Sequence, residues 1–119
     1  YEYKRGGQRF EVGTTTPAPY AALATAMDTV ESIGYDAIQA RVERLTDRLK
    51  DGLGDRLLSP HEYESGLVTF AADDPEATVE RLAAEGIVVR SLPHPDAVRA
   101  SVHAVNTADE VDRLLAALE

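Results

Sequence analysis

Two short patterns in this 119-residue chain have the residue types and spacing to hold negatively charged groups. Gly13-Thr14-Thr15-Thr16 offers hydroxyls and backbone N–H groups just before a helix that we expect to begin between Pro17 and Tyr20. Donors at a helix N-terminus suit a phosphate oxyanion, so this four-residue run is a candidate phosphate-binding segment. A threonine-rich helix cap would have the same sequence, and the pattern alone leaves both interpretations open.

The second pattern is Arg99, which alternates with Ser101 and His103 along a predicted strand. A guanidinium there could hold a carboxylate through two parallel hydrogen bonds, each contributing roughly 1.5–3 kcal/mol. Arg99 is therefore a candidate carboxylate ligand, and Arg90 in the preceding strand could join it. A surface arginine paired with a neighbouring carboxylate fits the spacing of Arg99 equally well, and Arg90 could be an ordinary edge charge.

Other catalytic arrangements are absent from the sequence, which has no GxSxG, HExxH, GxxxxGK or GxGxxG motif. The three histidines lie on different predicted elements without metal-ligand spacing; they are His61, His94 and His103. We interpret them as solvated side chains, although a two-histidine site built from His94 and His103 is an alternative. Adjacent carboxylates such as Asp109 and Glu110 are better explained as helix caps than as an acid and base pair.

Composition limits the possible partners. The formal net charge is −9, from 21 acidic and 12 basic residues, which disfavours nucleic acids and anionic membranes. No apolar run approaches the ~20 residues that span a bilayer, and the chain has no cysteine, so we expect a cytoplasmic protein. The scarcity of lysine beside many carboxylates suggests a halophilic origin as a hypothesis. Because the chain starts at Tyr1 without methionine, we expect it to be a piece of a longer protein.

The hydrophobic periodicity predicts four helices that would position these residues. Apolar residues at helical spacing run from Tyr20 to Val30, with Gly34 as the stop. A second helix is predicted from an Asp36 cap to Gly52 and Gly54. A third should start at Asp74-Pro75 and end at Gly86, and a fourth should follow the capping box that Thr107 begins.

Short β-branched runs predict three strands, at 67–71, 87–91 and 98–104, with a compact turn between the last two. On the third strand, alternation places Val98, Ala100 and Val102 toward the core and Arg99 on the other face. The predicted fold class is α+β, a small, mostly antiparallel sheet with helices against one face. We assign residues 1–19 to an N-terminal arm and residues 20–119 to a single domain.

Several segments in this order resemble the C-terminal part of class V aminotransferases, which are pyridoxal-phosphate (PLP) enzymes of fold type I. They are Arg9–Thr14, Ser32-Ile33-Gly34 with Ile38 and Arg41, Gly66–Phe70, Gly86–Arg90 and the closing run Val98–Asp112. The closing run, VRASVHAVNTADEVD, is the most specific of them. The resemblance covers residues 9–118. The family it points to includes cysteine desulfurases and isopenicillin-N-epimerase-like proteins.

The resemblance implies a role for each candidate residue. It implies that Gly13 and Thr14 lie near the cofactor phosphate of the neighbouring subunit in a homodimer, and that Arg99 binds the carboxylate of a small amino-acid substrate. The cofactor-bearing lysine, and the aspartate that partners the pyridine nitrogen, would belong to a large domain outside this chain, because Lys4 and Lys50 do not match that lysine. We expect Lys50 at the end of a surface helix, and no catalytic residue or bound cofactor in this chain alone.

The sequence departs from the resembling family in one respect. Cysteine desulfurases carry a catalytic cysteine between the last two strands, whereas this chain has Leu92–Ala97 there and no cysteine anywhere. Persulfide formation on this segment is therefore excluded, and an aminotransferase-like or epimerase-like member fits better. The alternative function is a free-standing α+β interaction or regulatory module without chemistry.

Overall fold

The structure, a computed structural model, describes residues 5–10, 13 and 16–119. The chain forms two compact units, Tyr1–Tyr35 and Asp36–Glu119. None of the described helices is long and apolar enough to cross a membrane.

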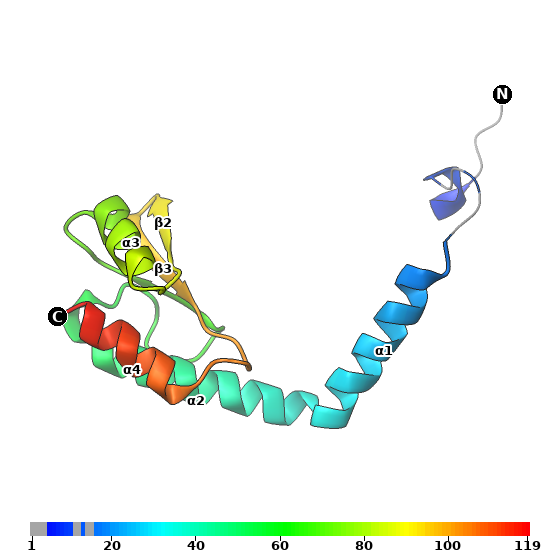
Figure 1. Ribbon diagram of the computed structural model, residues 1–119, viewed down its shortest axis with the longest axis horizontal. Helices are drawn as coiled ribbons and strands as arrows, with labels where there is room; N and C mark the ends of the chain where they lie inside the picture. Colours follow the sequence, from blue (N-terminus) through cyan, green and yellow to red (C-terminus); the bar gives the residue numbers. More distant parts are fainter. Residues whose placement is uncertain (1–4, 11–12, 14–15) are drawn as a thin grey trace. The chain divides into compact units, whose positions relative to one another are not determined.

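The N-terminal unit contains a short 3-10 helix, η1 (Gly6–Phe10), and helix α1 (Ala18–Ile33) (Figure 1). The predicted end of α1 is confirmed, because Gly34 has a φ of 90°, a conformation that favours glycine, and donates its N–H to the carbonyl of Val30 at 3.0 Å. No residue of α1 is buried. Its predicted apolar stripe is exposed, with Tyr20 at 64% and Leu23 at 58%.

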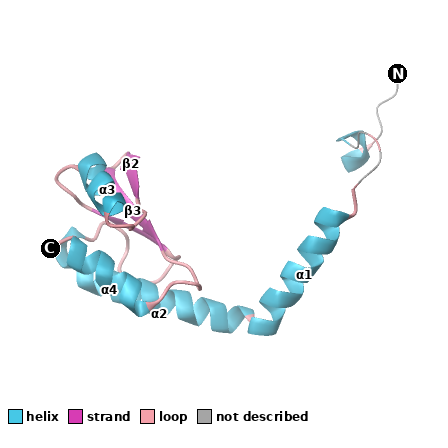
Figure 2. Ribbon diagram, viewed as in Figure 1, coloured by secondary structure: helices cyan, strands magenta, loops and turns pink. Residues whose placement is uncertain are grey.

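Helix α2 (Tyr35–Leu53) leads into the C-terminal unit (Figure 2). After it come η2 (Gly54–Arg56), β1 (Leu67–Phe70), α3 (Pro75–Ala84), β2 (Arg90–Pro93), β3 (Asp96–Ser101) and α4 (Ala108–Ala117). Two predicted caps are confirmed: the Asp74 carboxylate accepts from the N–H of Ala77 at 2.9 Å, and Thr107 forms a complete capping box with Glu110. Asp36 was expected to cap α2, but it lies within the first turn, because the helix starts directly after Gly34.

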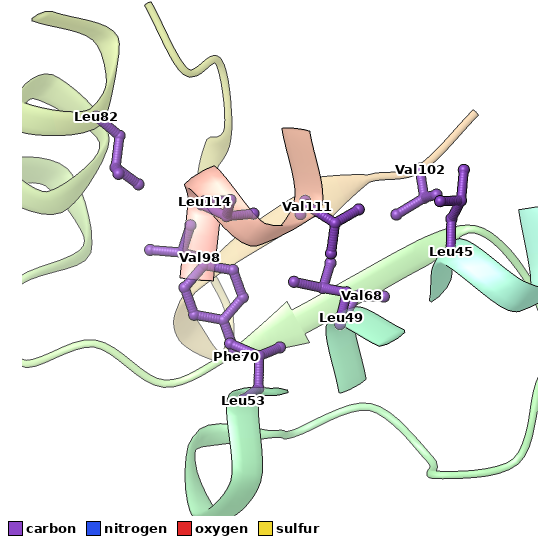
Figure 3. Close-up of a cluster of buried hydrophobic side chains, with 11 residues drawn as sticks. Leu45, Leu49, Leu53, Val68, Phe70, Leu82, Val98, Val102, Val111 and Leu114 are labelled. Carbon is purple, nitrogen blue, oxygen red and sulfur yellow. The ribbon is translucent and has the colours of Figure 1, made fainter. Parts of the chain in front are cut away.

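The three strands form an antiparallel sheet in the order β1-β3-β2. Phe70 lies opposite Val98 and Val68 opposite Ala100, so these four side chains share one face. They form a single hydrophobic cluster with residues of three helices (Figure 3); these are Leu45, Leu49 and Leu53 of α2, Leu82 of α3, and Val111 and Leu114 of α4. The predicted α+β class, with helices against one face of the sheet, is confirmed.

The second and third predicted strands have the wrong bounds. Strand pairing starts at Arg90 rather than Ile87, because the chain is still tied to α3 there: the Ile87 N–H donates to the carbonyl of Leu82 at 2.9 Å. The third strand ends at Ser101 rather than Ala104, because the chain turns and the Asn106 N–H donates to the carbonyl of His103 at 3.0 Å. The predicted alternation is nevertheless confirmed.

Candidate carboxylate-binding site

Two arginines lie side by side on the sheet face opposite the one that packs against α2, α3 and α4. The register pairs Arg99 of β3 with Arg90 of β2 on one side and with Thr69 of β1 on the other. Residues directly opposite each other project to the same face, with Cβ atoms ~4.5–5.5 Å apart. The sheet therefore brings together Arg99 and Arg90, the two candidate carboxylate ligands.

Neither guanidinium has a protein acceptor in the described part of the chain. Arg99 is half-buried, and its Nε is a buried atom without a hydrogen-bond partner. Arg90 is exposed and forms no hydrogen bond or ion pair with a described residue. Two like charges directly opposite each other destabilise a sheet, and a buried N–H without an acceptor adds a cost of about 1–3 kcal/mol. An anion held between the two guanidinium groups would offset their mutual repulsion. The alternative interpretation, an arginine neutralised by a neighbouring carboxylate, is not observed among the described residues.

The loop that follows β3 is held by hydrogen bonds from two helices. The Nε of Arg41, on α2, donates to the carbonyl of Ala104 at 2.6 Å, and its Nη2 donates to that of Asn106 at 2.7 Å. From α4, Glu110 accepts from the N–H of Thr107 at 2.9 Å and from the Asn106 amide at 3.2 Å. These bonds hold the pKa of Glu110 below its usual value, with the Thr107 N–H as the larger cause. The loop after the Arg99 strand is thus firmly positioned.

Sequence reasoning missed this role of Arg41. In the sequence, Arg41 belongs only to one of the segments that resemble the family, and the carbonyls it binds lie 63 and 65 residues further along the chain. Only the packing of α2 beside the β3–α4 loop brings them together, so no local pattern could reveal the contact. The same packing places Arg48 against Asp112, with Nε–Oδ1 and Nη2–Oδ2 distances of 2.6 and 2.7 Å.

The lysine expected on a surface helix is buried. Lys50 is 3% exposed, and its ammonium donates to the carbonyls of His61 at 3.3 Å and Glu62 at 2.8 Å. The prediction of a surface position was wrong, because the loop between η2 and β1 folds over the end of α2. Lys50 is a structural clamp on that loop. Lys4 lies outside the described residues.

The histidines form no metal site in the described ranges. His94 is exposed in the turn between β2 and β3, and His103 is exposed beyond the end of β3. His61 lies on the loop between η2 and β1, with its Nε2 3.4 Å from an Asp51 oxygen. Among residues 5–10, 13 and 16–119, no group of three His, Cys, Asp or Glu side chains could hold a metal ion. The interpretation of solvated histidines fits this placement, although His103 was wrongly assigned to a strand.

The candidate phosphate pattern is described only at Gly13 and Thr16. Gly13 has a φ of 95°, and no atom lies within 4 Å of the position that a Cβ would take. Its backbone is thus open to a ligand, as a phosphate contact requires. Thr14 lies outside the described residues. Gly13 belongs to the N-terminal unit and Arg99 to the C-terminal unit.

The chain is similar to known proteins over nearly its whole length. The family model described as aminotransferase class-V matches residues 1–114. A probable cysteine desulfurase of Halobacterium salinarum is 34% identical over 129 aligned positions, which cover 93% of this chain and 31% of the relative. A cysteine desulfurase of Synechococcus elongatus is 31% identical and covers 98% of this chain and 21% of its own length.

Two solved structures of one protein share this fold. The cystine C-S lyase C-DES, in complex with its reaction product cysteine persulfide, superposes with a TM-score of 0.81 at 29% identity. A variant of C-DES with glycine covalently linked to the PLP cofactor gives a TM-score of 0.82. Both cover 99% of this chain and 33% of C-DES, so the chain spans at most about a third of these relatives. Since the family model matches nearly every residue, the chain belongs to the class-V aminotransferase family.

Proposed function

We propose that this chain supplies the carboxylate-binding part of a PLP-dependent enzyme that acts on a small amino acid. The observation that carries the proposal is the cross-strand pair of Arg99 and Arg90, which has no acceptor in the described part of the chain. A planar guanidinium matches a carboxylate through two parallel hydrogen bonds, which an ammonium cannot do. The similarity to C-DES, which holds glycine linked to PLP in one structure, supports an amino-acid substrate.

In this proposal Arg99 binds and orients the substrate, and Arg90 adds a second positive charge. The half-buried position of Arg99 strengthens its hydrogen bonds, because less water competes for the carboxylate. A fixed carboxylate leaves the amino group and α-carbon of the substrate in one orientation. When bound, PLP supplies the electron withdrawal that makes bonds at the α-carbon labile.

We propose that the rest of the cofactor site lies elsewhere in the enzyme. Lys50 is buried and bound to two carbonyls, so it does not fit the lysine that would carry PLP. The open backbone at Gly13 fits a phosphate contact. Gly13 and Thr14 would bind the PLP phosphate of the partner subunit in a homodimer, and a large domain of the same enzyme would bind the remainder.

The chain also limits where sulfur could go if the substrate contains it. β2 and β3 are joined by the turn at His94-Pro95, and the chain has no cysteine. We therefore propose that no sulfur is stored on this chain and that any sulfur leaves on a small molecule. C-DES supports this, since its reaction product is cysteine persulfide. After turnover of the complete enzyme with cystine, the peptides of residues 1–119 should show no added sulfur by mass spectrometry; a gain of about 32 Da on one of them would contradict the proposal.

The carboxylate site is tested by Arg99→Lys in the complete enzyme. The change keeps the charge but removes the two-pronged geometry, so substrate binding should weaken about tenfold, one charge-assisted hydrogen bond being worth ~1.5–3 kcal/mol. The absorbance of bound PLP should stay the same. Arg44→Lys, an exposed arginine on α2, is the matched control and should change neither property. Unchanged substrate kinetics in Arg99→Lys would disprove the assignment.

A further inference from the structure

The segment Gly86–Val89, which we call the strap, has the side-chain pattern of a strand but pairs with no strand of the described residues. Ile87 and Val89 are partly buried against the core, whereas Val88 between them is 90% exposed. This alternation is that of a β-strand with one face inward. Pairing between β2 and β3 nevertheless begins only at Arg90, directly after the strap.

The strand beside the strap has unused hydrogen-bonding groups. The N–H of Val102 points to the β1 side, where it donates to the carbonyl of Gly66 at 2.7 Å. Successive residues of a strand direct these groups to opposite sides, so the N–H and C=O of Ser101 point toward β2. Neither makes a backbone hydrogen bond on that side within the described ranges. The strap, the end of β3 and helix α4 line a cavity of about 180 Å³, with Val88, Ser101 and Leu114 in its wall.

The register predicts where the strap would pair. Continuing the pair Arg90–Arg99 by two residues places Val88 opposite Ser101. Both residues lie on the same face as the two arginines, because each is two positions away from one of them. Closing the strap would therefore lengthen β2 next to the candidate carboxylate site and satisfy the backbone of Ser101.

We propose that the strap closes onto Ser101 when a carboxylate binds between Arg90 and Arg99. The inference rests on the proposed function of those arginines. The physical link is their mutual repulsion, which weakens β2–β3 pairing next to the strap until an anion neutralises it. The start of the strap is fixed, because Arg113 of α4 donates to the carbonyl of Glu85 and the Ile87 N–H donates to the carbonyl of Leu82. Closure at Val88 leaves the Ile87 bond in place, because the N–H groups of neighbouring strand residues point to opposite sides. Closure thus acts as a latch that holds Arg90 in place over bound substrate.

A disulfide trap tests the closure, since these 119 residues contain no cysteine that would compete with an introduced pair. Val88→Cys with Ser101→Cys places two thiols on directly opposed residues, whose Cα atoms would be ~5.5 Å apart after closure, within disulfide range. The rate of cross-linking under mild oxidation is measured in sodium acetate and in sodium chloride of equal ionic strength. We expect cross-linking about two- to fivefold faster in acetate, the effect of relieving one like-charge cross-strand pair.

The controls separate closure in register from general mobility. Val88→Cys with His103→Cys should cross-link more slowly and without an acetate effect, and Arg99→Gln should remove the effect from the Ser101 pair. Equal rates in acetate and chloride would overturn the strap proposal. The NMR signals of Arg90 and Arg99 then show which inference failed: if acetate shifts them, the carboxylate site stands without a latch, and if not, the site fails as well.

Discussion

The chemistry of Arg99 comes from three properties of a single residue: its planar guanidinium, its half-buried position and its lack of an acceptor within the described chain. Sequence spacing placed it on the correct face of its strand. Whether Arg99 has a hydrogen-bond acceptor could not be predicted, because any carboxylate that reaches it comes from residues far away in the sequence. The burial of Lys50 could not be predicted for the same reason, because it depends on the loop that carries Glu62, which no local pattern places over α2.

Gly66 is a residue at which one added methyl group should be costly. A Cβ there would lie 2.3 Å from the carbonyl oxygen of Val102, a backbone atom that cannot move without shifting the end of β3. We expect Gly66→Ala to lower the free energy of unfolding by about 1–3 kcal/mol, as measured by urea denaturation. Gly7→Ala, where a Cβ meets no atom within 4 Å, is the control and should not destabilise the chain. Equal stability of the two variants would contradict this packing.

Among the elements, α1, α3, α4 and β1 could be predicted well from the sequence, because each has strong local signals. Pro75 after the Asp74 cap, and the Thr107 capping box, fix helix starts through contacts between near neighbours. The bounds of β2 and β3 could not be predicted, because strand ends depend on partners elsewhere. At Ile87, a hydrogen bond to the preceding helix competes with strand pairing that the residue types favour.

The capping box makes the stability of α4 depend on pH. The pKa of Glu110 is lowered by the N–H of Thr107 and the amide of Asn106, so its carboxylate is stabilised in the folded state. This stabilisation is present above the ordinary pKa of a glutamate and is lost as the pH falls through the lower folded value.

We expect Glu110→Gln to be less stable than the unmodified chain at about pH 7 and to approach it at about pH 3, as measured by urea unfolding. Glu64→Gln, an exposed glutamate outside this network, is the control and should show a smaller change between the two conditions. A constant difference for Glu110→Gln at both pH values would show that its charge does not contribute.

At the scale of the whole molecule, the chain provides a compact α+β unit, and the candidate site lies on the sheet face opposite its helices. Its net charge of −9 makes this pair of arginines an exception to the overall acidity. The fold class could be inferred from caps, glycines and apolar alternation, because these are local signals, and the family from the resemblance carried by segments such as Val98–Asp112. The cofactor site could not be placed in the same way, since the chain spans at most about a third of its relatives.

The central claim is that Arg99 binds the carboxylate of an amino-acid substrate, and a cycle that varies both partners tests it most directly. The complete enzyme and its Arg99→Ala variant are each assayed for kcat/KM with an amino acid substrate and with the corresponding carboxamide. We expect the unmodified enzyme to have a higher kcat/KM with the carboxylate than with the carboxamide. In Arg99→Ala this ratio of kcat/KM values should fall at least about tenfold, the equivalent of one charge-assisted hydrogen bond. If both enzymes discriminate equally between carboxylate and carboxamide, Arg99 does not bind the carboxylate.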